Sequence, residues 1–315
     1  MQEPWANING ASIPASQAVI SVADAGFVLG ATVSEQLRTC GGKLFLLDEH
    51  LARLDRSLAI AGIDPGCSLA EIGTRAQELA ARNHPLLATG DDLGLAMFVT
   101  PGIYPTFGMA TQGGPTVGLH TYPLPFALWA KSYAAGASLV TVATQPVPSE
   151  CWPVEMKCRS RMHYFLADQQ ARAKQPGARA LLVDAQGRVH DTSTATLIAY
   201  FEREGFVIPP AERILPGISA AYTQTLAERL GLRWTRRDLS LAELRQADEL
   251  LLASTPFCLL SVTQLDGTSV GTGQPGLQYS RLMTAWSESV GIDLVEQAQR
   301  FTVRAKSTSG DSSTA

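Results

Sequence analysis

The sequence is poor in charged residues and has no long apolar run. Charged residues make up 17% of the 315 residues, below the roughly 25% of an average soluble protein, so we expect much surface to be buried, as in an obligate oligomer. The net charge is −4 and Lys and Arg are scattered, which argues against a nucleic-acid partner. No segment approaches the ~20 apolar residues of a membrane span, and no basic-then-apolar leader is present. These absences predict a cytoplasmic protein that acts on small molecules.

Cysteine is also sparse, and its pattern excludes a disulfide framework. The five cysteines are odd in number and include no C-x-x-C pair. They are Cys40, Cys67, Cys151, Cys158 and Cys258. Reduced thiols in a cytosolic protein explain them best, and we predict no metal site. Cys158 follows Lys157, but no histidine can be paired with it from the sequence, so we do not favour it as a nucleophile.

The length is sufficient for two domains with separate cores. We expect an N-terminal domain over residues 1–125, a linker over 126–131, a C-terminal domain over 132–292 and a disordered tail over 306–315. In the first domain, Asn9-Gly10 predicts a two-residue hairpin. Strands are expected over 19–22, 33–39 and 43–47, followed by a helix capped by Asp48. Arg53 and Arg56 lie three apart on that helix, which also fits a solvated basic face.

The chain is organised around residues 150–200. Here the pattern predicts a helix over 161–174, a strand over 180–184, a turn and a second strand over 189–200. Lys157 precedes the helix and Asp191 begins the second strand, 34 positions later. A nucleophilic lysine must be partly desolvated to lose its proton, and an acid on a strand can face the other end of a bound aromatic ring. Alone, each also fits an ordinary surface lysine or turn residue.

Three further features favour binding of a phosphate. Pro216-Gly217 turns the chain and Ser219 is expected to cap a helix, which places the backbone N–H groups of Ile218 and Ser219 at a helix N-terminus. Ser254-Thr255 supplies two hydroxyls where a strand ends. With Arg53, Lys157 and Asp191 these features make up the equipment for pyridoxal 5′-phosphate: a lysine for the aldehyde, an acid for the pyridine nitrogen and several phosphate ligands.

The order of these motifs resembles the class IV aminotransferases, the pyridoxal-phosphate family of fold type IV. That family includes branched-chain aminotransferases, D-amino-acid transaminases, (R)-amine transaminases and aminodeoxychorismate lyases. The resemblance covers about Asn7 to Gly267 and rests on NGASIP, DAGFVLGATVSEQLRT, EHLARL, MK, LLVDAQGRVHDTSTATL, ILPGIS and ADELLLASTPFCLLSV. It implies a two-domain α/β (α+β) fold with a small N-terminal domain, a larger C-terminal pseudo-barrel domain, the cofactor between them, and a homodimer whose partner closes the substrate pocket.

The resemblance also implies roles for individual residues. Lys157 is the Schiff-base lysine and proton-transfer base, and Arg53 binds the phosphate. The other implied cofactor contacts are Tyr164, Asp191, Thr196, Ile218, Ser219, Ser254 and Thr255, and the implied substrate contacts are Ser34 and Arg38. The chain departs from the family where Asp191 replaces Glu, Thr196 replaces Asn and Ser34 replaces an aromatic residue. The spacing from Lys157 to Tyr164 is longer than usual.

The predicted reaction moves an amino group between an amino acid or amine and a 2-oxo acid. Glu35 occupies a position typical of the transaminases rather than the lyases, and Arg38 resembles an arginine of the branched-chain enzymes. Residues 101–119 contain no Arg or Lys and no His, which removes the carboxylate trap of the D-amino-acid enzymes. The alternatives are an aminodeoxychorismate lyase and a non-catalytic binder of pyridoxal phosphate.

Overall fold

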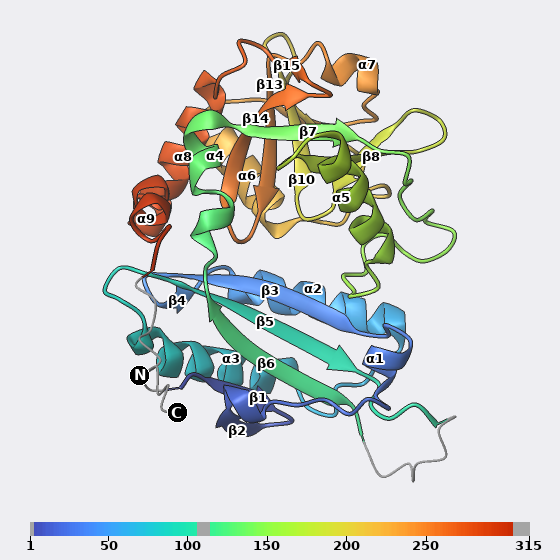
Figure 1. Cartoon of the computed structure of the whole chain (residues 1–315), viewed down its shortest axis with the longest axis vertical. Coiled ribbons are helices and arrows are strands. Elements are labelled where there is room, and N and C mark those ends of the chain that lie inside the picture. The colour runs from blue at the N-terminus through green and yellow to red at the C-terminus, as the bar shows by residue number, and fades with distance from the viewer. Residues whose placement is uncertain (1–2, 106–113, 305–315) are drawn as a thin grey trace, which may run out of the picture.

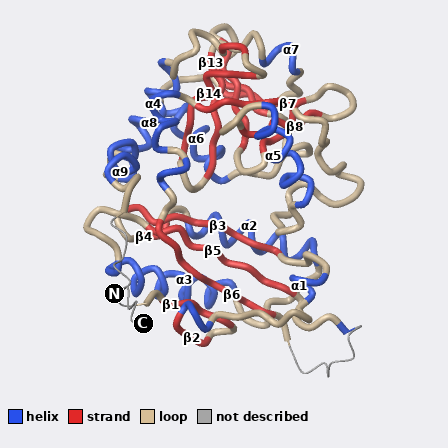
Figure 2. The backbone as a smooth tube through the Cα atoms, in the orientation of Figure 1, coloured by secondary structure: helices blue, strands red, loops and turns tan. Residues whose placement is uncertain are grey.

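The computed structural model describes residues 3–105 and 114–304. Two sheets lie one above the other, each with helices packed against it (Figure 1), and the tube view separates the two groups of strands (Figure 2). This mixed arrangement confirms the predicted α/β class. The predicted disordered tail, 306–315, lies outside the described residues.

The lower sheet has six strands in the order β2-β1-β6-β5-β3-β4, and all neighbours are antiparallel. The strands are β1 Trp5–Ile8, β2 Ala11–Pro14, β3 Val33–Cys40, β4 Lys43–Leu44, β5 Leu93–Thr100 and β6 Thr116–Pro123. The predicted hairpin at Asn9-Gly10 is confirmed, since both residues have positive φ, 51° and 86°. A short helix, α1 Ala25–Val28, precedes β3.

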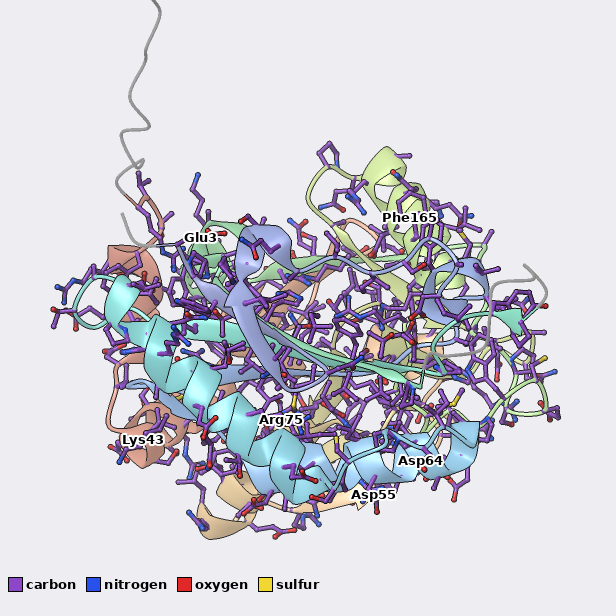
Figure 3. All side chains as sticks on the ribbon, turned by 90° about the horizontal axis from the view of Figure 1, so that it is seen from below. Glu3, Lys43, Asp55, Asp64, Arg75 and Phe165 are labelled. Atoms are coloured by element: carbon purple, nitrogen blue, oxygen red, sulfur yellow. The ribbon has the colours of Figure 1, made fainter. Side chains whose placement is uncertain are left out.

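Two long helices, α2 Leu47–Ala61 and α3 Leu69–Asn83, cover one face of this sheet and lie side by side in the view from below (Figure 3). Leu37 of β3 packs with Leu54 and Ile72 of these helices in the core between them. The neighbouring residues of β3 therefore face the other sheet, because side chains alternate along a strand.

Three predictions for this half are wrong in detail. The strand expected over 43–47 is cut to β4 because α2 begins at Leu47, after Leu46 in a left-handed conformation with φ 53°. Asp48 therefore lies in the first turn of α2 and does not cap it. Residues 19–22 form no strand, and Val19 and Val22 are exposed.

The upper sheet has nine strands, in the order β12-β11-β10-β13-β14-β7-β8-β9 with β15 paired to β14. The strands are β7 Ala137–Thr141, β8 Arg179–Val183, β9 Val189–Thr192, β10 Thr196–Phe201, β11 Gly205–Ile208, β12 Trp234–Arg236, β13 Glu249–Ser254, β14 Cys258–Leu265 and β15 Thr268–Ser269. The edge strand β9 also contacts β10, so the sheet curls into a half-barrel. The single strand predicted over 189–200 is thus two strands, joined by a turn at 193–195.

The helices of this half are α4 Ala130–Ala135, α5 Met162–Lys174, α6 Ile218–Arg229, α7 Leu241–Leu244, α8 Leu277–Val290 and α9 Leu294–Arg300. Residues 126–131, expected as a linker, contain a 3-10 turn and the start of α4, and Phe126 and Trp129 are buried. The sequence did not predict α9, which returns to the lower sheet through a hydrogen bond from Gln297 to Asp92, 2.8 Å. Across the described ranges, no helix is long and apolar enough to cross a membrane.

Candidate active site

A cavity of about 510 Å³ lies between the two sheets. Its volume is within the range typical of sites for small molecules. The lower sheet contributes residues of β3, β5 and β6, and the upper sheet contributes four loops, 157–161, 192–196, 215–219 and 253–257. Ten of the eleven predicted site residues line it: Ser34, Arg53, Lys157, Tyr164, Asp191, Thr196, Ile218, Ser219, Ser254 and Thr255.

Lys157 is held in the cavity wall by backbone hydrogen bonds. Its carbonyl accepts from the N–H of Ser34 at 3.0 Å, and its own N–H donates to Ser57 Oγ at 3.1 Å. Burial and the positive charges of Arg53 and Arg161 lower the pKa of the Lys157 ammonium to about 8, although Glu35 opposes the shift. A lysine with such a pKa has an appreciable neutral fraction near neutral pH, as nucleophilic catalysis requires.

A buried ion pair fixes Arg53 beside the lysine. Arg53 Nε donates to Glu35 Oε1 at 2.7 Å and Nη2 donates to Oε2 at 2.8 Å, while His50 Nδ1 lies 2.7 Å from Oε2. Burial raises the pKa of the Glu35 carboxyl, but the hydrogen bonds and charges of Arg53 and His50 outweigh it and hold the pKa at about 2. Glu35 is therefore an anion that orients Arg53, a role that the sequence did not reveal.

The N-terminus of α6 lies next to this arginine, because Arg53 Nη1 donates to the carbonyl of Pro216 at 2.8 Å. Gly217 is the N-cap and has no side chain to satisfy the first N–H groups of α6, so the prediction that Ser219 caps the helix is wrong. A Cβ on Gly217 would lie 2.6 Å from Thr196 Oγ1, so any larger residue here would force the Thr196 side chain to move. The unsatisfied N–H groups of Ile218 and Ser219 and the adjacent guanidinium suit a phosphate.

Asp191 carries a buried oxygen that lacks a partner. Its Oδ2 accepts from the N–H of Leu215 at 3.1 Å, whereas Oδ1 has no hydrogen bond to any described residue. Burial raises the pKa of the carboxyl well above its usual value, although the hydrogen bond from Leu215 opposes this. A buried carboxyl with an orphan oxygen at a cavity wall fits a cationic donor, such as a protonated pyridine nitrogen. The site residues therefore fit pyridoxal phosphate at both ends.

The other predicted cofactor contacts, Ser254, Thr255 and Tyr164, differ in whether other residues already bind their side chains. Ser254 Oγ donates to the Thr194 carbonyl at 2.6 Å and thus holds the 193–195 turn. Thr255 lines the cavity without such a bond among the described residues. Tyr164 packs its ring under Arg161, with Cζ 4.6 Å from the ring centroid. Burial raises the pKa of the Tyr164 phenol to about 12, and the nearby Asp191 adds to this shift.

Arg38, predicted to contact the substrate, does not line the cavity. It is 1% exposed, and its guanidinium donates to the Thr39 and Pro256 carbonyls at 3.1 Å each and to Gln297 Oε1 at 2.9 Å. These bonds tie β3 to the start of β14 and to α9. The structure therefore gives Arg38 a role in joining the two halves.

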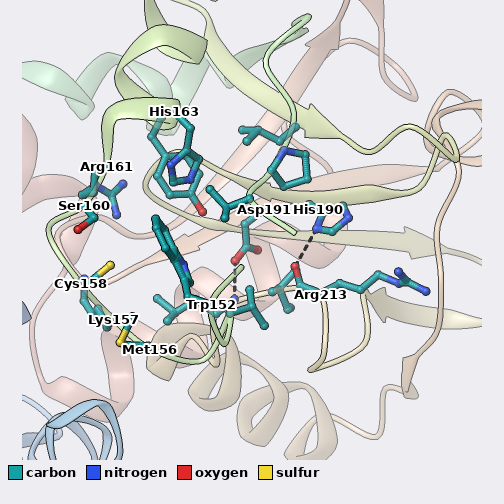
Figure 4. A pocket seen from close by; sticks show the side chains of 17 residues that line it. Trp152, Met156, Lys157, Cys158, Ser160, Arg161, His163, His190, Asp191 and Arg213 are labelled. Carbon is teal, nitrogen blue, oxygen red and sulfur yellow. Dashed lines mark hydrogen bonds between the residues drawn. The ribbon is translucent and has the colours of Figure 1, made fainter. Parts of the chain in front are cut away.

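A smaller cavity of about 60 Å³ adjoins Lys157 and Asp191 (Figure 4). Trp152, His163 and Met156 line it, and it shares Lys157, Arg161, Tyr164, Asp191 and Leu215 with the larger cavity. It is thus an extension of the same site.

The ionisable residues of the site that sequence reasoning missed include His50, Arg159, Arg161 and Arg179. His50 lies three positions before Arg53 on one helix face, a spacing that signals contact with a shared partner. Arg159 and Arg161 alternate with Lys157 in a K-x-R-x-R pattern, which places them on the same side of an extended segment. Only Arg179 had no local signal.

Comparison with known proteins identifies the class. The profile of the family described as Amino-transferase class IV matches residues 32–265. The chain is 29% identical over 283 residues to a D-alanine aminotransferase of Bacillus licheniformis, which covers 90% of this chain and 95% of that protein. It is 27% identical to branched-chain-amino-acid aminotransferase-like protein 2 of Arabidopsis thaliana, over 88% of this chain and 48% of that protein.

Solved structures share the fold. The branched-chain amino acid aminotransferase of Escherichia coli has a TM-score of 0.82 at 20% identity, over 91% of this chain and 94% of that chain. An aminotransferase from Brucella abortus, bound to the cofactor pyridoxal phosphate, has a TM-score of 0.77 at 20% identity, over 91% of this chain and 99% of that chain. The chain belongs to the class IV aminotransferase family. It is accordingly a transaminase that depends on pyridoxal 5′-phosphate, as its motifs implied.

Proposed function

We propose that this enzyme transfers the amino group of an amino acid to a 2-oxo acid, with Lys157 as both the cofactor-binding lysine and the proton-transfer base. The observation that carries the proposal is the convergence of Lys157, Arg53 and the orphan oxygen of Asp191 on one cavity. When bound, pyridoxal phosphate supplies an electron sink that acidifies the substrate α-carbon. The chain's residues must bind that group, orient it and move the proton.

Lys157 is suited to move the proton. Its pKa of about 8 leaves Nζ partly neutral near neutral pH, so that it can accept a proton and later return it. Ser34 and Ser57 fix its backbone on both sides, which limits the movement of the side chain to its own rotatable bonds. One base in a fixed place serves both proton transfers.

Arg53, the N–H groups of Ile218 and Ser219, and Thr255 are the proposed ligands of the phosphate. Glu35 keeps the guanidinium of Arg53 at the α6 terminus, because it binds Nε and Nη2 and leaves Nη1 directed to Pro216. At the other end, the free Oδ1 of Asp191 would hold the ring nitrogen and its proton. That cation would lower the pKa of the Asp191 carboxyl, against the effect of burial, and keep the carboxyl ionised.

We also propose that the enzyme is a homodimer. Met162, Phe165 and Leu166 lie three and four positions apart on α5 and form an exposed apolar stripe, with Phe165 visible on the surface in Figure 3. Val22 and Phe27 are also exposed, in the segment that precedes β3. Ser160, which precedes α5, donates a 2.8 Å hydrogen bond to the carbonyl of Gly30 in that segment. Sedimentation of wild type and Phe165→Asp tests this: a monomeric wild type would contradict it.

A donor panel tests the reaction. The purified holoenzyme is mixed with an L-branched amino acid, a D-amino acid and an aminodeoxychorismate-type substrate, and the spectrum of the bound cofactor is followed in each half-reaction. Both D-alanine and branched-chain enzymes are among the relatives, so both donor classes are needed. Conversion of the cofactor to its amine form, reversed by pyruvate or 2-oxoglutarate, is the expected result. Pyruvate release without that conversion would support a lyase, and no spectral change with any donor would support a binder.

A further inference from the structure

The turn that joins β13 to β14 lies beside the proposed phosphate site. Thr196 of β10 pairs with Ala253 of β13, and a Cβ on Gly217, the N-cap of α6, would lie 2.6 Å from Thr196 Oγ1. Ser254 and Thr255 directly follow Ala253 and line the cavity. The register of the sheet therefore brings the two hydroxyls of this turn to the α6 terminus.

Residues 254–258, which we call the phosphate turn, have an unfavourable backbone conformation at one position. Ser254 and Cys258 pair across the two strands, and the residues between them form the loop. Cys258 has φ 59°, a left-handed conformation that residues other than glycine disfavour. Its Sγ accepts a hydrogen bond from Arg38 Nη1 at 3.4 Å. Because such a conformation persists only where its surroundings hold it, the contacts of the phosphate turn need to be accounted for.

Two buried side chains hold the backbone of the phosphate turn. Arg38 Nη1 donates to the carbonyl of Pro256 at 3.1 Å. Tyr133 OH donates to the carbonyl of Phe257 at 2.8 Å. These two carbonyls belong to the residues that follow Thr255 in the chain. Arg38 and Tyr133 therefore fix the backbone that positions the Thr255 hydroxyl.

Arg38 is itself held from α9. Its Nη2 donates to Gln297 Oε1 at 2.9 Å, and Gln297 Nε2 donates to Asp92 Oδ2 at 2.8 Å. Gln297 thus connects a buried cation with a buried carboxylate, since Arg38 and Asp92 are 1% and 0% exposed. A hydrogen-bonded network of buried polar groups is rigid when its members are satisfied. This network links α9, which contributes no residue to the cavity wall, to the phosphate turn.

We propose that Arg38 is a positioning residue for the cofactor phosphate, which it affects by holding the phosphate turn and thereby Thr255, and that Gln297 keeps Arg38 in place. The inference rests on the proposed function, which makes Thr255 a phosphate ligand, and adds the residues that position that ligand. Arg38 does not line the cavity, so it acts without touching the cofactor. Without its bond to Pro256, the turn is free to leave its unfavourable conformation and carry the Thr255 hydroxyl away from the α6 terminus.

Binding of pyridoxal phosphate and of pyridoxal to the apoenzyme tests this role, because the two ligands differ only in the phosphate. The visible absorption of the bound ligand follows each titration. Thr255→Val and Arg38→Met should each weaken the binding of pyridoxal phosphate at least about tenfold and leave the Kd of pyridoxal within about twofold. The double variant should lose no more than either single variant, because both substitutions remove the same contact. Gln297→Leu should show a smaller loss, about two- to tenfold, again for pyridoxal phosphate alone.

Arg304→Gln is the matched control. Arg304 follows α9 and donates to Asp91 Oδ2 at 2.7 Å and to Oδ1 at 2.8 Å. It thus ties the same end of the chain to the segment before β5, as Gln297 does, but has no bond to Arg38 or to the phosphate turn. The control should change neither Kd.

The outcomes separate this inference from the proposed function. An equal loss of both ligands in Arg38→Met, no loss of either, or a loss that adds to that of Thr255→Val would overturn the positioning role and leave Thr255 as a phosphate ligand. Unchanged binding of pyridoxal phosphate by Thr255→Val would refute that ligand itself, and the role of Arg38 with it. If Arg38→Met does not fold, Gln297→Leu decides: a loss that is equal for both ligands, or absent, overturns the inference.

Discussion

Removal of Arg53 should have two separable effects, on cofactor affinity and on stability. Arg53→Ala deletes a phosphate ligand, and a charged hydrogen bond is worth roughly 1.5–3 kcal/mol, or about 10- to 150-fold in Kd. It also leaves Glu35 buried with only His50 as a partner, at a cost of up to about 3–5 kcal/mol. The lowering of the Glu35 pKa from 4.5 to about 2 corresponds to roughly 3 kcal/mol, the net effect of Arg53 and His50 together after burial has opposed them.

The pH dependence of the stability loss follows from the same pKa. A carboxyl whose pKa is lowered by folding stabilises the protein fully above its unfolded value and loses this contribution as the pH falls through its folded value. The difference between wild type and Arg53→Ala in free energy of unfolding should therefore be largest at neutral pH and shrink as the pH falls toward about 2, because Glu35 without Arg53 is protonated at a higher pH than Glu35 of wild type. Urea unfolding of the apoenzymes at several pH values measures it.

Two variants serve as controls. Arg56→Ala removes an exposed arginine one turn along the same helix and should change neither quantity. Arg53→Ala combined with Glu35→Gln removes the stranded charge, so it should recover much of the stability and none of the cofactor affinity. Equal cofactor Kd values for Arg53→Ala and Arg56→Ala, or a stability loss that the double variant does not relieve, would refute the reasoning.

Three further predictions concern the lysine, the acid and the α6 terminus. The rate of cofactor uptake by the apoenzyme should rise with pH around a midpoint of about 8, because only neutral Lys157 attacks the aldehyde; a midpoint near 10.5 would contradict the desolvated site. Asp191→Asn should keep the cofactor and lose most of the half-reaction rate in stopped-flow measurements, since an amide cannot hold the ring proton by charge. Asp191→Glu should keep activity if the site has room for one more methylene. A wild-type rate for the Asn variant would show that Asp191 is only a turn residue. Gly217→Ala should weaken cofactor binding, measured by equilibrium dialysis, because its Cβ would lie 2.6 Å from Thr196 Oγ1; unchanged affinity would mean that the α6 terminus is not the phosphate site.

The sequence predicted those site residues for which the local pattern and the order of motifs along the chain indicated the same role. Lys157 precedes a helix, as expected, and the structure brings it and Asp191 to one cavity, although Asp191 is the third of the four residues of β9 and does not begin the strand. The pattern did not predict the break at 193–195, because the alternation of residues continues through it. That break is what presents the turn bound by Arg161 and Arg179.

The errors arose where a residue's role depends on distant partners. Arg38 lies on the same face of β3 as Ser34, but its guanidinium donates hydrogen bonds to the Pro256 carbonyl and to Gln297 of α9. The sequence did not show that these two residues lie close to Arg38. Ser219 looked like a helix cap because serine favours that position, whereas α6 begins two residues earlier than such a cap allows. Arg179 belongs to the site only because β8 lies beside β9 in the curled sheet.

The most direct test of the account is to find the lysine that carries the cofactor. The purified holoenzyme is reduced with borohydride, digested, and its peptides are weighed by mass spectrometry, with Lys157→Ala treated in parallel. We predict that the reduced cofactor is attached to the peptide that contains Lys157 and that the variant shows no attachment. Attachment to another lysine, or an adduct that persists in Lys157→Ala, would contradict the assignment of Lys157.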